Sequence, residues 1–99
     1  MAVDKKGTLT YIHLQKEDLA VFRIVPEDGI IPDYDAGQFI TVGMPIPSEN
    51  NKIVRRAYSM ASHPENKKFI ELVIRWVRRP LPGRVTTALF NSGEGDEVS

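Results

Sequence analysis

The sequence Phe69-Ile-Glu-Leu-Val-Ile-Arg-Trp-Val77 decides the fold, because it has the most regular apolar pattern in the chain. In an extended strand, successive side chains point to opposite faces. One face then carries four large apolar side chains, those of Ile70, Leu72, Ile74 and Trp76. Glu71 and Arg75 lie on the other face. This period of two predicts a β-strand over 69–77 whose apolar face belongs to the core.

Five other segments have strand character, and turn-forming residues separate them. Strands are predicted over 8–14, 19–25, 37–43 and 53–59, and residues 97–99 resemble the opening of a sixth strand. Loops are predicted over 30–36 and 44–51, where proline, aspartate and asparagine are frequent. One helix is predicted over 84–91, because Val85, Ala88 and Leu89 recur at helical spacing. Short strands with turns at regular intervals favour an all-β fold, a small antiparallel barrel with one short helix.

Length and composition exclude several classes of protein. A chain of 99 residues fits one domain with a single core, so residues 1–99 are treated as one unit. Its 13 basic and 13 acidic residues cancel, so no general field attracts nucleic acid or an anionic membrane. The absence of cysteine excludes disulfides and thiolate metal sites. No apolar run approaches the length of a membrane span, and we expect a cytoplasmic protein.

The segment Arg56-Ala57-Tyr58-Ser59 combines a permanent cation, a flat ring and a small hydroxyl group. In a strand, Arg56 and Tyr58 leave the same face. A guanidinium can donate two hydrogen bonds to a phosphate, tyrosine can lie against a flat heterocycle, and a serine hydroxyl can bond to a ring nitrogen. The pattern indicates an anionic, partly aromatic ligand. The same four residues also suit an ordinary edge strand with a solvated arginine.

A second segment, Gly83-Arg-Val-Thr86, stands where the predicted strand over 69–77 gives way to the predicted helix. The first N–H groups of a helix lack internal partners, and with the positive end of the helix dipole they can bind a phosphate. Glycine lets the phosphate approach closely. Alone, this segment equally fits a simple helix cap, but a second phosphate cradle explains the arginine at position 56.

Four motifs together resemble the flavin domain of the ferredoxin–NADP reductase family, in its bacterial type. They are R-x-Y-S-x-x-S at 56–62, G-x-x-[ST] at 83–86, G-Q-[FY] at 37–39 and G-D-E-[VL] within 94–98. They follow the family's order over about residues 7 to 98. The resemblance implies a six-stranded antiparallel Greek-key barrel that holds FAD on its outside, with FMN the less favoured flavin. The last strand is incomplete in this chain.

The resemblance also implies a role for each matching residue. Tyr58 would stack on the isoalloxazine ring, Ser59 would hydrogen-bond near N5 where hydride arrives, and Arg56 would pair with the pyrophosphate. Tyr58 and Ser59 are therefore the catalytic candidates. The cofactor-binding candidates are Arg56, Ala57, Tyr58, Ser59, the main chain of Val73, Ile74 and Arg75, and the N–H groups of Gly83, Arg84, Val85 and Thr86.

The family's nicotinamide-binding domain has no counterpart in these residues. We therefore expect an FAD-binding domain of an NAD(P)H-dependent oxidoreductase that exchanges electrons with an iron–sulfur or flavin protein, such as a ferredoxin or flavodoxin. The 99 residues alone are expected to lack NAD(P)H turnover, either as a fragment or as a subunit that meets its nicotinamide domain on another chain. A stand-alone flavin-binding electron-transfer subunit and a cofactor-free barrel acting as an interaction module remain as alternatives.

Other chemically suggestive residues receive little weight. His13 and His63 lack the neighbouring ligands that a metal site needs, so no metal is expected. Asp33 and Asp35 flank Tyr34 in a predicted loop, where aspartate commonly serves turn formation. A basic cluster near the expected phosphate site suits either a solvated surface or an acidic electron carrier; it consists of Arg75, Arg78, Arg79 and Arg84.

Overall fold

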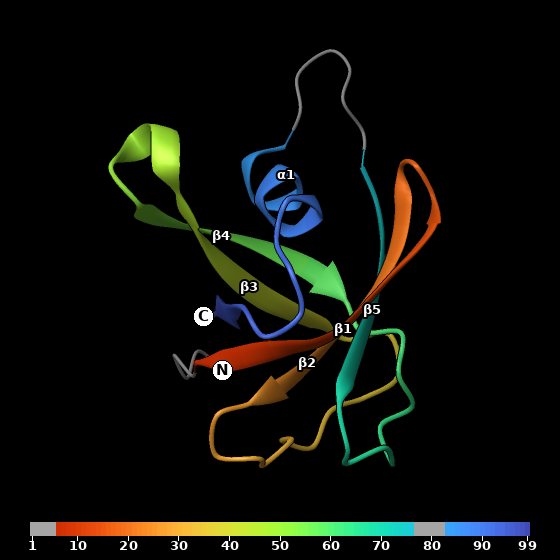
Figure 1. Cartoon of the computed structure of the whole chain (residues 1–99). Helices are drawn as coiled ribbons and strands as arrows, with labels where there is room; N and C mark the ends of the chain where they lie inside the picture. Colours follow the sequence, from red (N-terminus) through yellow and green to blue (C-terminus); the bar gives the residue numbers. More distant parts are fainter. Residues whose placement is uncertain (1–5, 77–82) are drawn as a thin grey trace.

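The computed structural model describes residues 6–76 and 83–99. Within these ranges the chain forms β-strands, one short 3₁₀ helix (η1) and one α-helix (Figure 1). The elements, in order, are β1 (Gly7–Lys16), β2 (Leu19–Pro26), β3 (Phe39–Ile46), η1 (Pro47–Glu49), β4 (Lys52–Ser59), β5 (Ile70–Arg75), α1 (Arg84–Phe90) and β6 (Glu97–Val98). The predicted mainly β fold with one short helix is confirmed.

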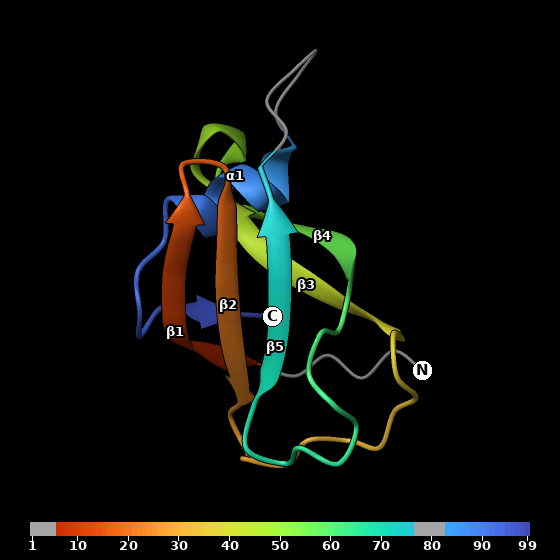
Figure 2. The same cartoon turned by 90° about the vertical axis from the view of Figure 1, so that its right-hand side faces the viewer.

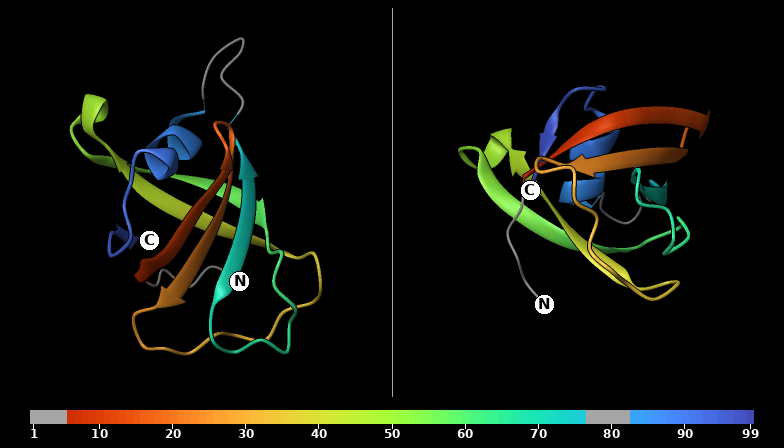
Figure 3. Two further views of the ribbon diagram at one scale, coloured as in Figure 1. Left: turned by 45° about the vertical axis from the view of Figure 1, so that its right-hand side comes forward. Right: turned by 90° about the horizontal axis from the view of Figure 1, so that it is seen from below.

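The strands form two antiparallel sheets that curl toward each other. The larger sheet has the order β5-β2-β1-β6, and the smaller one pairs β3 with β4. Figure 2 shows β1, β2 and β5 side by side, and Figure 3 shows α1 lying between the two sheets. Backbone hydrogen bonds connect the sheets on both sides. Gly43 and Ser99 exchange two of them, at 2.9 and 3.0 Å, and Ala61 N–H donates to Glu71 C=O at 2.7 Å.

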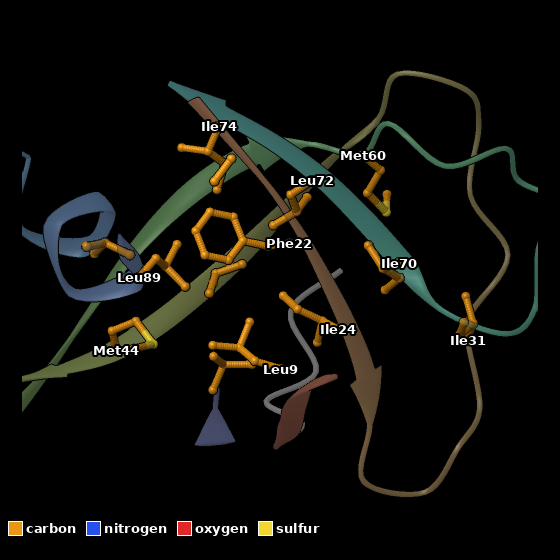
Figure 4. Packing of buried hydrophobic residues seen from close by; sticks show 14 residues of the cluster. Leu9, Phe22, Ile24, Ile31, Met44, Met60, Ile70, Leu72, Ile74 and Leu89 are labelled. Atoms are coloured by element: carbon orange, nitrogen blue, oxygen red, sulfur yellow. The ribbon is translucent and has the colours of Figure 1, made fainter. Parts of the chain in front are cut away.

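The core fills the space between the sheets and α1. Phe22 of β2 is fully buried at its centre (Figure 4). It makes an edge-to-face contact with Phe90 of α1, at 5.5 Å between ring centroids. The other fully buried large side chains are Leu9, Val42, Ile70, Leu72 and Leu89. Burying each such side chain contributes about 1.5–3 kcal/mol, so packing against the helix stabilises both sheets.

The alternation predicted for 69–77 is confirmed as far as Arg75. Ile70, Leu72 and Ile74 are buried, whereas Val73 is 50% exposed. Trp76 was expected on the same strand face, but the strand ends before it. Its indole instead packs on Phe90 at 5.0 Å and donates to Thr87 Oγ1 at 3.0 Å, so it covers the core through α1. Val77 lies outside the described residues.

The third strand differs most from its prediction over 37–43. Gly37 has a φ of 77° and belongs to the preceding turn, so β3 begins at Phe39. At its other end β3 continues to Ile46, through residues that were expected to be a loop. Pro45 pairs with Ile53 inside a two-stranded sheet. A proline is tolerated there because β3 has only one ladder partner in this sheet, and the missing N–H can face away from it.

The other boundaries move by one or two residues. The strands predicted over 8–14, 19–25 and 53–59 are β1, β2 and β4, the helix predicted over 84–91 is α1, and the opening strand at 97–99 is β6. Within the described ranges, no helix is long and apolar enough to cross a membrane.

Candidate functional site

Arg56 and Tyr58 project from the same face of β4. In the β3–β4 ladder, Arg56 lies opposite Val42 and Tyr58 lies opposite Ile40, so all four share the face that carries the core residues of β3. Arg56 is exposed, whereas Tyr58 is half-buried against the core. The Arg56 Cζ atom lies 5.9 Å from the centroid of the Tyr58 ring. The predicted pairing of a cation with a flat aromatic surface is therefore present.

The Tyr58 hydroxyl joins β4 to the first turn of α1. It lies 2.7 Å from Thr86 Oγ1, and either hydroxyl can donate. Burial raises the pKa of Tyr58, while the hydrogen bond from Thr86 and the charge of Arg56 act in the opposite direction. Tyrosine is a neutral phenol at physiological pH, and the raised pKa moves its ionisation further into the alkaline range. Its ring is thus held at both ends, by the strand and by the helix.

Gly83 brings the start of α1 against Arg56. It occupies the N-cap position, with φ −68° and ψ 135° and without a side-chain cap. A Cβ atom added there would lie 3.1 Å from Arg56 Nη1 and 3.7 Å from Thr86 Oγ1. Thr87 N–H donates to Gly83 C=O at 2.9 Å, and the N–H groups before it have no partner within the helix. Hydrogen-bond donors from a side chain and from the backbone therefore converge here.

The strands β4 and β5 meet at one point and separate from there. At that point the Glu71 C=O accepts from Ala61 N–H at 2.7 Å, and the Glu71 N–H donates to Ser62 Oγ at 3.1 Å. Beyond it, β4 pairs with β3 while β5 pairs with β2. The two strands therefore belong to different sheets and, among the described residues, share no ladder; the unpaired stretch between them beyond this junction is called the opening, and Tyr58 and Ser59 lie on its β4 side.

The edge of β5 that faces this opening carries the backbone groups of alternate residues. Trp76 N–H donates to Asp18 C=O at 2.6 Å on the β2 side, whereas Glu71 directs both backbone groups to the other side. Backbone direction alternates along an antiparallel strand, so Val73 and Arg75 face the opening and Ile74 faces β2. β5 is an edge strand of its sheet. The edge therefore offers the N–H and C=O groups of Val73 and Arg75.

The remaining predicted residues occupy distinct positions around this centre. Ala57 and Ser59 lie on the opposite face of β4 from Tyr58, across from Thr41 and Phe39, and both are exposed. Val85 is buried in the core. The guanidinium of Arg84 is held by both carboxylate oxygens of Glu49 in η1, at 2.7 and 2.9 Å. The side chain of Arg56, rather than that of Arg84, is the one beside Gly83.

The residues given little weight have local roles. Asp33 forms an ion pair with Lys67 at 2.9 Å, which lowers the pKa of its carboxyl group. His13 stacks on Tyr11, and His63 Nδ1 accepts from Glu65 N–H. Arg75 lies 3.3 Å from an Asp18 carboxylate oxygen, while Arg78 and Arg79 lie outside the described residues. In ranges 6–76 and 83–99, no three His, Asp or Glu side chains gather as a metal site.

Two contributors to the site were not predicted. Tyr34 bonds through its phenol to Ser62, next to the point where β4 meets β5. Glu49 fixes the first residue of α1. The R-x-Y-S-x-x-S spacing marks Ser62, but no sequence signal marks its partner 28 residues earlier. The proximity of Glu49 to Arg84 likewise follows only from the fold.

The donor groups fit a flavin dinucleotide. An anionic pyrophosphate needs hydrogen-bond donors and positive charge, which Arg56 and the uncapped start of α1 provide together. A flat ring needs an aromatic surface and a polar edge. Tyr58 and the free edge of β5 provide these on the two sides of one opening. A Cβ atom at Gly83 would intrude on the region beside Arg56 that suits the pyrophosphate.

Comparison with known proteins gives a matching family model and solved structures with the same fold. A family model described as the oxidoreductase FAD-binding domain matches residues 6–99. A search of curated proteins gives no match. Among solved structures, the flavohem-like FAD/NAD-binding domain of nitric oxide dioxygenase from Vibrio cholerae O1 biovar El Tor has a TM-score of 0.82 at 23% identity, over 95% of this chain and 40% of that one.

Two further solved structures share the fold. The cytochrome b5 reductase domain of Ulva prolifera nitrate reductase has a TM-score of 0.77 at 20% identity, over 94% of this chain and 38% of that one. A ferredoxin NADP+ reductase from Neisseria gonorrhoeae, solved with bound FAD and NADP, has a TM-score of 0.75 at 18% identity, over 94% and 34%. The chain thus spans 34% to 40% of the length of the three structures.

Proposed function

This chain belongs to the oxidoreductase FAD-binding domain family, of the ferredoxin reductase type, and we propose on that basis that it binds FAD for NAD(P)H-linked electron transfer. The observation that carries the proposal is the convergence of Arg56 with Gly83 beside the Tyr58–Thr86 hydrogen bond. These groups come from two elements far apart in sequence. Their meeting supplies positive charge, backbone donors and an aromatic surface in one region.

Most of the predicted residues have a place in this proposal. Arg56 and the N–H groups of residues 83–86 hold the pyrophosphate, and this preference for two phosphates favours FAD over FMN. Val73 and Arg75 offer backbone groups to the flavin and ribityl chain. The main chain of Ile74 was expected to line the flavin as well, but its backbone groups face β2, and its side chain is buried in the core. Ala57 leaves the outer surface of β4 uncrowded next to Ser59.

FAD, when bound, supplies hydride acceptance and the release of single electrons. Tyr58 orients the ring by lying against it, and as a neutral phenol it adds no charge to the reduced flavin. Ser59 offers a hydroxyl group to the ring nitrogen that exchanges hydride. Tyr58 and Ser59 are therefore the residues that we assign to the redox step.

The finer features of the protein follow as proposals. The two sheets close into a six-stranded Greek-key barrel, supported by the Gly43–Ser99 and Ala61–Glu71 hydrogen bonds at their two junctions. NAD(P)H binds to a domain other than residues 1–99, so these residues alone turn over no NAD(P)H. Electrons pass to a ferredoxin or flavodoxin-like carrier in the cytoplasm.

A flavin titration tests the proposal. We expect the 99-residue chain to quench FAD fluorescence and shift its absorbance, and Arg56→Ala to weaken binding about tenfold or more, as loss of a charge-assisted hydrogen bond does. Arg55→Ala is the matched control, because Arg55 projects from the opposite face of β4. Riboflavin, which lacks phosphate, should not distinguish Arg56→Ala from wild type. An unperturbed FAD spectrum at micromolar protein would rule out the flavin role.

A further inference from the structure

Tyr34 lies outside all four sequence motifs, yet its phenol reaches the point where β4 meets β5. The hydroxyl lies 2.9 Å from Ser62 Oγ, 3.1 Å from the Ser62 carbonyl oxygen and 3.1 Å from the His63 carbonyl oxygen. The ring itself is half-buried and packs against the core. A loop residue on a surface segment is therefore tied, by three short contacts, to the residues that follow β4.

The direction of these hydrogen bonds follows from their partners. Both carbonyl oxygens can only accept, so Tyr34 is the donor in its contacts with them. Ser62 Oγ accepts the Glu71 N–H; in its contact with the Tyr34 oxygen either hydroxyl can donate, and Ser62 is the donor whenever Tyr34 donates to a carbonyl. Consecutive hydrogen bonds of this kind strengthen one another. Ser62 is only 8% exposed, and the Tyr34 hydroxyl and the Glu71 N–H provide hydrogen-bond partners for its hydroxyl group.

This chain of hydrogen bonds lies at the junction between the end of β4 and the edge of β5. Glu71 is held on that side by two bonds, one from Ala61 N–H and one to Ser62 Oγ. Ser59 lies two residues before Ala61, and Val73 lies two residues after Glu71. A change in the orientation of Ser62 therefore moves the two sides of the opening relative to each other, next to the groups that contact the flavin.

We propose that Tyr34 is a positioning residue for the flavin ring, acting through Ser62 and Glu71 on the opening between β4 and β5. The inference rests on the proposed flavin function and adds a residue from outside the motifs to it. Tyr34 touches no cofactor group. It fixes the Ser62 hydroxyl, which in turn fixes the β5 edge against the end of β4.

The loop that carries Tyr34 has other attachments, which make a selective test possible. Lys67 forms an ion pair with Asp33 at 2.9 Å, and Met60 N–H donates to the Gln38 carbonyl oxygen at 2.9 Å. Removing only the Tyr34 hydroxyl leaves both contacts and the buried ring in place. Tyr34→Phe therefore changes the hydrogen-bond chain without releasing the loop.

The experiment titrates FAD into wild-type chain, Tyr34→Phe, Ser62→Ala and Ser62→Thr. We expect Tyr34→Phe and Ser62→Ala to weaken binding about threefold to tenfold, the range that one neutral hydrogen bond gives, and to alter the absorbance spectrum of the bound flavin at saturation. Ser62→Thr keeps the hydroxyl and should restore both. Tyr11→Phe, which removes a phenol from β1, serves as the control and should match wild type.

The outcomes separate the two proposals. A wild-type chain that fails to bind FAD overturns the flavin function, and the positioning role with it. A wild-type chain that binds, with Tyr34→Phe equal to it in affinity and in saturated spectrum, overturns the positioning role alone. Weaker binding with an unchanged spectrum, in proportion to a fraction of unfolded protein measured by circular dichroism, also overturns it, because Tyr34 would then act only on the stability of the fold.

Discussion

Tyr58 is the residue at which the two parts of the site meet. Its backbone belongs to β4, its ring packs against the core, and its hydroxyl bonds to Thr86 of α1. The resemblance gave this residue a role at the flavin ring, and the structure adds the contact that orients the side chain. That contact joins residues 28 positions apart, so no local pattern in the sequence could indicate it.

The raised pKa of Tyr58 makes stability depend on alkaline pH. A tyrosine with a folded-state pKa above its unfolded value of about 10 favours the folded state while it is protonated. Its contribution is complete below pH 10 and is lost as the pH rises through the folded-state pKa. We expect the urea midpoint of wild type to fall between pH 9 and 11, and that of Tyr58→Phe to fall less. Equal slopes for both proteins would contradict this.

We expect Gly83 to matter for binding rather than for its backbone conformation. Its φ of −68° is open to any residue, but a Cβ would lie 3.1 Å from Arg56 Nη1, the end of a flexible side chain. We expect Gly83→Ala to fold with nearly wild-type stability while binding FAD several-fold more weakly, because Arg56 must move. Gly93→Ala is the control, since a Cβ there meets no atom within 4 Å. Unchanged FAD affinity in Gly83→Ala would argue against the pyrophosphate site.

Among the elements, the strands were predictable and their exact ends were not. Alternation and turn residues located β1, β2, β4 and β5 to within two residues. The end of β3 was missed because proline usually marks a loop, whereas Pro45 tolerates its place in a strand with a single ladder partner in its sheet. Trp76 was misplaced for a related reason, since its packing on Phe90 depends on where α1 lies.

An ion pair that the sequence did not indicate holds the first residue of α1. Arg84, the first residue of α1, is held by both oxygens of Glu49, 35 residues earlier. Because both side chains are partly solvated, we expect Glu49→Gln to cost no more than about 1 kcal/mol of unfolding free energy, and less at high salt. Urea unfolding at 20 mM and 500 mM salt measures the difference, with Glu27→Gln as the control. A loss unaffected by salt would mean that packing, not charge, is responsible.

For the whole molecule, stability depends on one core shared by both sheets and α1. Phe22 is fully buried there, so Phe22→Ala should cost about 3–5 kcal/mol, a large part of the 5–15 kcal/mol typical of a small domain. Leu14→Ala is the control, because Leu14 is 59% exposed. Denaturation in urea measures both variants. A Phe22→Ala midpoint close to that of Leu14→Ala would mean that the two sheets do not share a core.

The mainly β architecture could be predicted from the sequence, but the side-chain contacts that assemble the candidate site could not. Alternation and turn chemistry are local, and they gave the mainly β fold. The contacts that assemble the site run from Tyr34 to Ser62, from Glu49 to Arg84 and from Tyr58 to Thr86. Each joins side chains that the fold brings together, and such pairs leave no periodic signal in a single sequence.

The most direct measurement of the central claim is an amide-resolved NMR titration of the 99-residue chain with FAD. If the flavin lies between β4 and β5 with its pyrophosphate at the start of α1, the largest shifts should occur at Tyr58, Ser59, Val73 and Arg75 and at residues 83–86. Amides in the turn after β2, at residues 27–29, whose backbone bonds go to Lys6 and Pro26, should change little. Saturable binding with shifts confined to other surfaces, or no shifts at all, would contradict the claim.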